Sequence, residues 1–362
     1  MDLPENFRDE EELDEFISRP SEEVIDLFRR LDGDLVVLGV AGKMGIHLAT
    51  MARRAADAAD AADGADAAGA ADTAGGPKTA RRVTGVARFS DALSRERLER
   101  AGVRTVACDL LDRKKTETLP DAPNVVFMAG RKFGTSGEES ATWASNVLMP
   151  GLTAERYADS RIAAFSTACV YPFTSPGSGG SREDDAPSPV GEYAWTALGR
   201  ERVFDWNSRR RGTRVSLIRL SYSIDLRYGV LRDIAERVLA GTPVDLSVPC
   251  ANVVWQGDAI AQALLSLERA SSPPFVLNVS GPETVSVRRT AEAFARAFGR
   301  ECAFRGEEGP LALLANTQRA ARLFGYPRVS LDAMIGWTAD WTARGLRSLG
   351  KPTHFDAADG RF

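Results

Sequence analysis

A glycine triplet at GxxGxxG spacing constrains the fold of this chain more than any other feature. Gly39, Gly42 and Gly45 follow the apolar run Leu35–Leu38 and precede a helical pattern over His47–Arg54. We expect Gly39 to permit a tight turn, Gly42 to let phosphates approach the backbone, and Gly45 to let the helix pack on the strand. The N-terminus of that helix offers free N–H groups to an anion. The pattern predicts a dinucleotide-binding strand–loop–helix.

Apolar, β-rich runs alternate with helical patterns from Asp34 onward. Near-continuous hydrophobic runs of this length are typical of parallel strands buried on both faces, and intervening helices imply right-handed crossovers. The predicted class is therefore α/β, a doubly wound parallel Rossmann sheet with a smaller C-terminal substrate lobe. The predicted strands are Leu35–Leu38, Val83–Ala87, Thr105–Cys108, Val125–Met128, Ile162–Phe165 and Val215–Ile218.

Four segments are expected along the chain. Residues 1–32 carry twelve acidic and four basic side chains, and Ser21 has the character of an N-cap for a leader helix packed on the main domain. A regulatory or partner-binding arm is the alternative. Residues 33–221 form the predicted Rossmann domain and residues 222–350 the substrate lobe, with strands that return to the sheet. Residues 351–362 form a C-terminal tail.

An insertion over residues 55–77 consists almost entirely of Ala, Asp and Gly. Such a segment can bury too little apolar surface to offset its ordering entropy, so we expect a mobile insertion. An alanine-rich extension of the preceding helix is the alternative.

The bulk composition excludes several classes of function. A net charge of −4 gives no electrostatic reason to expect nucleic acid or an anionic membrane as a partner. No apolar run approaches the length of a spanning helix, and the acidic N-terminus does not resemble a signal peptide. Four scattered cysteines and two histidines provide no metal-binding pattern. We therefore expect a cytoplasmic globular protein without a metal.

The end of the second predicted strand bears on the choice of cofactor. NAD-selective enzymes place an acidic side chain there to bind the ribose hydroxyls. This chain has Ala87 at that position, followed by Arg88 and Ser90, which could receive a 2′-phosphate. We expect NADP, with NAD as the alternative. After the third strand, Asp109 and Leu110 are expected to reach the adenine, with a buried turn aspartate as the competing interpretation.

Taken in order, the motifs of residues 33–345 resemble the extended short-chain dehydrogenase/reductase superfamily, the NAD(P)-dependent epimerases and dehydratases. The chain resembles an atypical member of this superfamily, because it lacks the lysine that normally follows the catalytic tyrosine by four residues. Beyond the glycine triplet and Asp109–Leu110, the motifs are Phe127–Gly130, Asn146–Gly151, Ser166–Tyr171, Tyr193, Glu201, Gly257–Asp258, Asn278–Gly281 and Gly325–Trp337.

The resemblance implies a catalytic pair. In the family, a tyrosine phenol exchanges a proton with the substrate hydroxyl while hydride moves to or from the nicotinamide, and a Ser or Thr hydroxyl holds the same oxygen. Tyr193 and Thr167 match those positions. The family places a lysine four residues after the tyrosine, but this chain has Ala197 there. Glu201 keeps the register and indicates that the lysine is absent rather than displaced.

Three interpretations of the missing lysine remain open. Lys132 could supply the cation, because Ala129–Lys132 resembles the cofactor-contacting Ala-Gly-x-Lys of UDP-galactose 4-epimerases, while Arg131 and Arg200 are weaker candidates. The substrate could be acidic enough to need no strong base. Alternatively, the protein could bind the dinucleotide without turnover. The expected cofactor-binding residues are Gly39, Gly42, Lys43, Met44, Gly45, Arg88, Ser90, Asp109, Leu110, Ala129, Gly130 and Asn146.

The substrate is less constrained. Nucleotide-sugar members usually carry an arginine shortly before the Val-Asp-Asp-like segment, and Asn252–Asp258 has none. A nucleotide sugar is therefore less secure than the fold suggests, and a free sugar, cyclitol or other polyol is credible. The residues expected to line the substrate cleft are Arg131, Arg227, Tyr228 and Trp255. The resemblance also implies a homodimer formed through the helices that carry Asn146 and Tyr193.

Overall fold

A seven-stranded parallel sheet forms the centre of the molecule. The computed structural model describes residues 3–69, 81–132, 134 and 137–357. The strand order is β11-β6-β5-β4-β1-β2-β3, so the chain starts in the middle of the sheet and winds outward twice. This is the doubly wound order that the alternating pattern predicts. The strands are β1 (Leu35–Leu38), β2 (Val83–Ala87), β3 (Arg104–Ala107), β4 (Asn124–Phe127), β5 (Arg161–Thr167), β6 (Arg214–Leu220) and β11 (Phe275–Val279).

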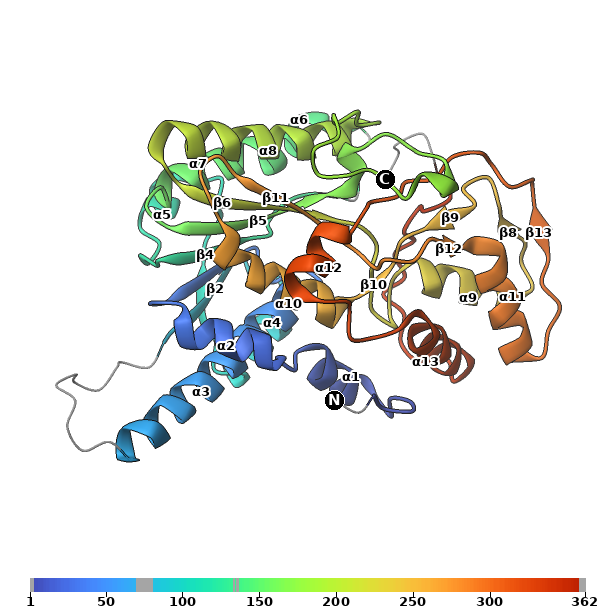
Figure 1. Ribbon diagram of the computed structural model, residues 1–362, viewed down its shortest axis with the longest axis horizontal. Coiled ribbons are helices and arrows are strands. Elements are labelled where there is room, and N and C mark those ends of the chain that lie inside the picture. The colour runs from blue at the N-terminus through green and yellow to red at the C-terminus, as the bar shows by residue number, and fades with distance from the viewer. Residues whose placement is uncertain (1–2, 70–80, 133, 135–136, 358–362) are drawn as a thin grey trace.

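Helices cover both faces of this sheet, as Figure 1 shows. β1 and β4 are buried at every position, because each face packs against helices. One face carries α5 (Arg113–Glu117), α6 (Glu139–Trp143), α7 (Met149–Arg156) and α8 (Glu192–Arg211), with a π-helical turn, Ala144–Leu148, between α6 and α7. The other carries α3 (Gly45–Gly69), α4 (Ala92–Arg100), α10 (Gln256–Leu265) and α12 (Gln318–Phe324).

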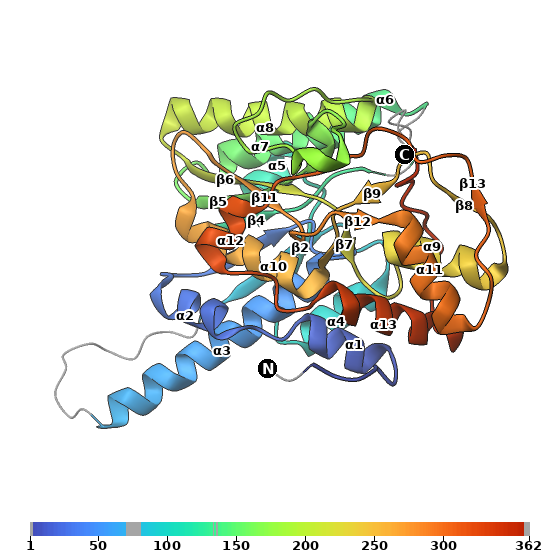
Figure 2. The ribbon, with the colours of Figure 1, turned by 45° about the vertical axis from the view of Figure 1, so that its right-hand side comes forward.

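Residues 55–69 correct one prediction. They continue α3 as a regular helix that projects from the body of the protein (Figures 1 and 2). Alanine has the highest helix propensity, and Ala55, Ala56 and Ala59 are fully buried in the main hydrophobic cluster. The compositional argument overlooked that small side chains allow close packing of two helices. Residues 70–77 of the predicted insertion lie outside the described residues.

The N-terminal segment forms two helices, α1 (Glu10–Ile17) and α2 (Glu22–Arg30). Ser21 caps α2 through its side chain, as predicted, whereas α1 was not predicted. α2 packs along α3, and Figure 2 shows α1 beside α13 (Leu331–Ala343). Phe7 and Phe16 enter an aromatic cluster with Trp255 and Trp337. The segment is thus an integral part of the core.

The C-terminal lobe is built on three helices, α9 (Val230–Ala240), α11 (Val287–Phe298) and α13. Short strands complete it, and β11 returns to the central sheet as predicted. These strands are β7 (Ser223–Ile224), β8 (Val244–Asp245), β9 (Cys250–Ala251), β10 (Val254–Trp255), β12 (Val285–Ser286) and β13 (Phe304–Arg305).

The described part of the C-terminal tail packs against α9. The backbone N–H of Thr353 donates a hydrogen bond to Asp233 at 2.8 Å, and Arg237 forms an ion pair with Asp356 at 2.8 Å. Phe355 is buried beside them. Among the helices of the described residues, none is long and apolar enough to cross a membrane.

Candidate active site

The glycine loop connects β1 to α3 at the carboxyl edge of the sheet. Gly39 has a φ of +88°, and a β-carbon there would lie 2.5 Å from the Ala129 backbone nitrogen. A β-carbon at Gly45 would lie 2.3 Å from the Val40 carbonyl oxygen. Gly39 therefore makes the turn and Gly45 permits the close helix–strand contact, as predicted.

The same loop has the shape and the donors to bind an anion. A β-carbon at Gly42 would meet nothing closer than the Gly39 carbonyl oxygen at 3.4 Å, and Gly42 is exposed. Among the described residues, none accepts a hydrogen bond from the backbone N–H of Lys43 or Met44. These N–H groups precede the N-terminus of α3. Orphan donors at the positive end of a helix dipole suit a phosphate, so the loop fits a dinucleotide.

The Lys43 side chain turns away from the loop toward the C-terminal lobe. Its Nζ lies 3.9 Å from the centroid of the Tyr228 ring and donates to the Ser223 carbonyl oxygen at 3.3 Å. Burial lowers the pKa of Lys43 to about 7, while the charge of Asp225 opposes that shift. Lys43 therefore joins the loop to the lobe, and only its backbone belongs to the anion-binding part of the loop.

Thr167 and Tyr193 come together at the carboxyl end of β5. Thr167 is the last residue of β5, and Tyr193 lies in the first turn of α8. Burial and the nearby Cys169 raise the pKa of the Tyr193 phenol to about 12, although the charge of Arg200 and a hydrogen bond with Thr167 lower it. The structure brings these two side chains to one site, where the phenol is a weaker acid than free tyrosine, and their catalytic roles stay a prediction.

A buried network beneath this pair holds β5, β6 and α8 in register. Glu201 accepts hydrogen bonds from Ser166 at 2.6 Å and from two nitrogens of Arg219 at 3.0 and 2.8 Å. Arg219 also donates to the Tyr171 hydroxyl at 2.8 Å. Because Ser166 precedes Thr167, this network fixes the strand end on which Thr167 lies.

Ala197 occupies the position of the missing lysine. It lies one turn after Tyr193 and is buried in an apolar cluster with Val170, Tyr171 and Leu198. No cation stands at this point of α8. The helix continues in register to Glu201, so the absence of the lysine is a property of the site and not a shift of the sequence.

Lys132 was predicted to be the first substitute for that lysine. Among the charges that act on Tyr193, that of Arg200 lowers its pKa. Burial lowers the pKa of Lys132, and the charges that oppose this shift are those of Cys169 and Asp233. Because Cys169 also acts on Tyr193, Lys132 lies near the same site, and its role as a substitute for the lysine stays a prediction.

Asn146 is corrected from a direct ligand of the cofactor to a structural brace. It is fully buried in the π-helical turn. Its Oδ1 accepts from the Arg131 backbone and from Arg200, both at 2.8 Å, and its Nδ2 donates to the Arg131 carbonyl and to Thr196, both at 2.9 Å. All four hydrogen bonds of the carboxamide are used within the protein. Asn146 thus pins the Ala129–Arg131 loop to α8.

Two predicted substrate residues, Arg227 and Trp255, are committed to the interior. Arg227 is buried and donates to Asp225 at 2.9 and 2.7 Å and to Asp14 at 2.9 Å. Trp255 is 1% exposed within the aromatic cluster beside Phe7. Both side chains hold the N-terminal segment. Trp255 is closed off from the surface, whereas the small exposed part of Arg227 contributes to the wall of a cavity in the C-terminal lobe. Arg131 is half-buried and donates to the Gly134 carbonyl oxygen at 2.7 Å, at the rim of the cleft.

Of the residues expected at the adenine end, Arg88 and Ser90 lie on the surface, Asp109 is half-buried and Leu110 is buried. Arg88 and Ser90 are exposed after β2, and Arg88 forms no ion pair with a described residue. Asp91, the nearest carboxylate, caps α4 by accepting from the Leu93 and Ser94 backbones. Asp109 accepts from the Leu111 backbone at 3.0 Å, which favours the turn interpretation of that aspartate.

Sequence reasoning missed two residues, Cys169 and Tyr222, that lie close to the predicted pair and to Tyr228. Cys169 acts electrostatically on Tyr193, Tyr222 and Tyr228, so these side chains surround one cleft. Tyr222 has a φ of +22°, in the region that glycine normally occupies. The only sequence signal for Cys169 was its place two residues after Thr167. Nothing in the sequence distinguished Tyr222.

A cavity of about 280 Å³ extends the cleft beyond Tyr228 into the C-terminal lobe. Its charged lining includes Arg227, Arg232, Asp233, Glu236, Arg237 and Lys351.

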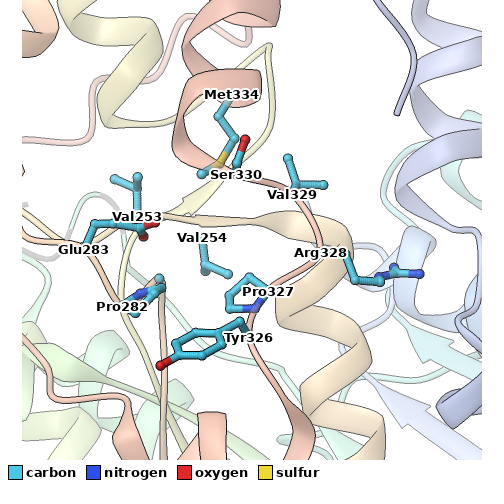
Figure 3. A pocket seen from close by; sticks show the side chains of 11 residues that line it. Val253, Val254, Pro282, Glu283, Tyr326, Pro327, Arg328, Val329, Ser330 and Met334 are labelled. Carbon is cyan, nitrogen blue, oxygen red and sulfur yellow. The ribbon is translucent and has the colours of Figure 1, made fainter. Parts of the chain in front are cut away.

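A separate cavity of about 270 Å³ opens between residues Val253 and Val254 and the segment Tyr326–Ser330, with Arg328 pointing away from it (Figure 3). No predicted site residue lines this second cavity. Within the described ranges, no cluster of His, Cys, Asp or Glu is arranged to bind a metal.

No protein-family model matches the sequence, and no curated protein is significantly similar to it. Solved structures, however, share its fold. The structure titled MoeE5 in complex with UDP-glucuronic acid and NAD superposes with a TM-score of 0.66 at 21% identity, covering 87% of this chain and 100% of that one.

Two further structures show the same likeness. UDP-glucuronic acid 4-epimerase from Bacillus cereus, in complex with NAD, gives a TM-score of 0.68 at 18% identity, covering 86% of this chain and 99% of that one. UDP-glucose 4-epimerase from Thermotoga maritima, with UDP-glucose, gives 0.64 at 17% identity, with the same coverage. At these identities the likeness establishes an epimerase-like Rossmann fold over most of the chain.

Proposed function

We propose that this protein is an NAD(P)-dependent enzyme of the extended short-chain dehydrogenase/reductase type. It acts as an epimerase, dehydratase or oxidoreductase on a hydroxyl or ketone of a sugar-like substrate. The placement of Thr167 and Tyr193 together, on the sheet edge that carries the glycine loop, is the observation that carries the proposal. Structural neighbours in complex with NAD or UDP-sugars support the same class of chemistry.

The residues of this chain would bind the cofactor, hold the reacting oxygen and move the proton. The Gly39–Gly45 loop holds the pyrophosphate through its backbone N–H groups. When bound, the nicotinamide dinucleotide supplies the hydride acceptor or donor. The Thr167 hydroxyl holds the reacting oxygen by a hydrogen bond, and ionised Tyr193 takes the proton from the substrate hydroxyl. As the O–H proton moves to the phenolate, the carbon that carries this oxygen would lose a hydride, which the bound dinucleotide would accept, and the alcohol would become a ketone. In the reverse direction the phenol of Tyr193 would return the proton to the oxygen.

Two further features support a choice of ligands. Arg88 is exposed and unpaired among the described residues, and Asp91 is used as a helix cap, so we propose NADP over NAD. The cavity beside Tyr228 is lined mainly by polar and charged side chains, which suits a hydroxyl-rich, sugar-like substrate.

The exposed face of α6–α8 supports the proposed homodimer. Four large apolar side chains are exposed there, a concentration that monomeric proteins rarely show. They are Trp143, Leu148, Trp195 and Trp206, at 43, 55, 53 and 63% exposure. We expect a dimer in solution by analytical ultracentrifugation, and Trp206→Glu to shift it toward monomer while exposed Arg88→Ala leaves the mass unchanged.

The proposed activity is tested by measuring cofactor binding by calorimetry and nicotinamide absorbance with a panel of free, acidic and nucleotide-linked sugars. We expect binding of NADP or NAD and an absorbance change with at least one substrate. Tyr193→Phe should lower turnover by about a hundredfold or more with little change in cofactor affinity. Cofactor binding without turnover on any substrate, together with no effect of Tyr193→Phe, would instead identify a dinucleotide-binding protein.

A further inference from the structure

The charge environment of Tyr193 differs from what its sequence neighbours suggest. The position one turn after Tyr193 is Ala197, which lies in an apolar cluster and brings no charge. Burial raises the pKa of the Tyr193 phenol, so an ionised phenol at this place needs a cation beside it. The next residue on the same helix face that carries a charge is Arg200.

Helix geometry brings the head of Arg200 back toward Tyr193. Residues 193, 197 and 200 share one face, because seven residues make almost two turns of an α-helix. Side chains on a helix lean toward its N-terminus, so a long side chain at position 200 reaches over the preceding turn. The Arg200 guanidinium is buried and lies 5.7 Å from the centroid of the Phe127 ring.

The polypeptide is shaped to hold this guanidinium. Nη1 donates to the Phe165 carbonyl oxygen and Nη2 to Asn146 Oδ1, both at 2.8 Å. A β-carbon at position 130 would lie 2.3 Å from Nη2, so Gly130 is required for Arg200 to lie where it does. Asn146 is in turn held by the Arg131 backbone and by Thr196. The head of Arg200 therefore lies between the end of β4, the end of β5 and α8.

The charge of Arg200 is not cancelled by its hydrogen-bond partners. Both acceptors are neutral oxygens, and its Nε has no acceptor among the described residues. Burial lowers the pKa of Arg200, and the charges that oppose this shift are those of Tyr193 and Glu201. Glu201 itself is committed to Arg219 by two hydrogen bonds. The positive charge therefore remains available to the phenol.

We propose that Arg200 is a positioning residue that takes over the electrostatic role of the missing lysine, by placing a fixed positive charge beside Tyr193 and bracing the Gly130–Asn146 edge. This inference rests on the proposed function, because it concerns the ionisation of the proposed base.

An arginine suits this place better than a lysine would. The surroundings of the cleft lower the pKa of Lys43 to about 7 and also lower that of Lys132, in both cases mainly through burial. A lysine in such a place would lose part of its charge near neutral pH. A guanidinium stays protonated when buried, and its planar head can donate to Phe165 and Asn146 while keeping its charge.

The first test compares Arg200→Gln with Arg200→Lys in the full-length protein. Arg202→Gln is the matched control, because Arg202 is exposed on the same helix and the change removes the same charge. We expect Arg200→Gln to lower kcat/KM at pH 7 by about ten- to a hundredfold, since one to two units of phenol pKa correspond to that range. The rise of its kcat/KM with pH should move to higher pH. Arg200→Lys should lose less activity than Arg200→Gln below pH 7, where a buried lysine keeps its charge, and this advantage should shrink as the pH rises through the pKa of the lysine.

The second test reads the phenol directly, without turnover. Difluorotyrosine, whose phenol ionises at lower pH than tyrosine, is placed at position 193 and titrated by its phenolate absorbance. We expect the midpoint to be about one unit or more higher with Arg200→Gln than in the parent protein. Arg202→Gln should leave the midpoint unchanged. Circular dichroism and thermal unfolding establish that each variant is folded.

The outcomes separate the inference from the proposed function. An unchanged midpoint and pH profile in folded Arg200→Gln would overturn the role of Arg200, even if the parent protein turns over substrate. Equal losses in Arg200→Gln and Arg200→Lys below pH 7, where the lysine is charged, would also overturn it, because they would show that packing and not charge matters. A parent protein without cofactor binding or turnover would instead overturn the proposed function, while the absorbance titration still reports on Arg200.

Discussion

Two buried arginines lie on either side of the strand end that carries Thr167, and their surroundings differ. Arg219 is paired with Glu201 through two nitrogens, and this pairing raises its pKa although burial opposes it. Arg200 donates only to neutral oxygens, and burial lowers its pKa. A charge that serves the fold is neutralised by a partner. A buried charge left without a carboxylate marks a place where the protein uses that charge for something else.

Removing the neutralised arginine should have the largest effect on stability. Arg219→Gln leaves Glu201 buried without its partner, and breaking one side of a buried pair costs about 3–5 kcal/mol. We expect that loss in the free energy of unfolding, measured by urea denaturation. A loss below about 1 kcal/mol would show that the charge of Glu201 is stabilised by groups other than Arg219. Arg219 would then no longer be an example of an arginine that serves the fold, in contrast to Arg200.

Arg227 provides a second neutralised case, which acid should break. Burial alone would raise the pKa of Asp14, but His47, Arg227 and Arg97 hold it at about 2. A lowered carboxyl pKa adds stability above its unfolded value of 3.8, and this stability is lost as the pH falls toward 2. The contribution is about 2 kcal/mol. Asp14→Asn should therefore flatten the stability profile between pH 4 and pH 2, measured by denaturation at each pH.

The arginine without a carboxylate should matter less for stability. Arg200→Gln removes hydrogen bonds but also removes a buried charge, so we expect a loss of only about 1 kcal/mol. The same substitution at Arg219 and at Arg200 makes the two measurements directly comparable. If Arg200→Gln cost as much as Arg219→Gln, the guanidinium would be a structural group like its counterpart.

Arg88 extends the comparison to the surface. Arg88→Ala should change the free energy of unfolding by less than about 0.5 kcal/mol, because the side chain is exposed and unpaired among the described residues. We expect it to weaken NADP binding by about tenfold and to leave NAD binding unchanged, as measured by calorimetry. A parent protein that prefers NAD would contradict the proposed cofactor.

The contrast also explains which features the sequence could predict. The Gly39–Gly45 loop and the strands depend on local spacing, so the pattern located them within a few residues. Arg227 was expected in the cleft because one of its partners, Asp14, is more than two hundred positions away, although the other, Asp225, is only two positions away. Lys132 was ranked above Arg200 because the reach of a side chain along a helix face becomes visible only with the strands in place. The helical extension of α3 was only the second choice, because composition does not show that its alanines are buried against distant residues.

The N-terminal segment has a consequence for how the two lobes can move. It holds the Rossmann domain through contacts from Arg54 to Ser18 and from His47 to Asp14. It holds the C-terminal lobe through Trp337, which donates to the Pro4 carbonyl oxygen, and through Arg227. The cleft lies between the parts that the segment ties together. Opening of the lobes is thereby limited to what these contacts allow, and a shortened chain lacking the segment would exchange ligands by a wider hinge motion.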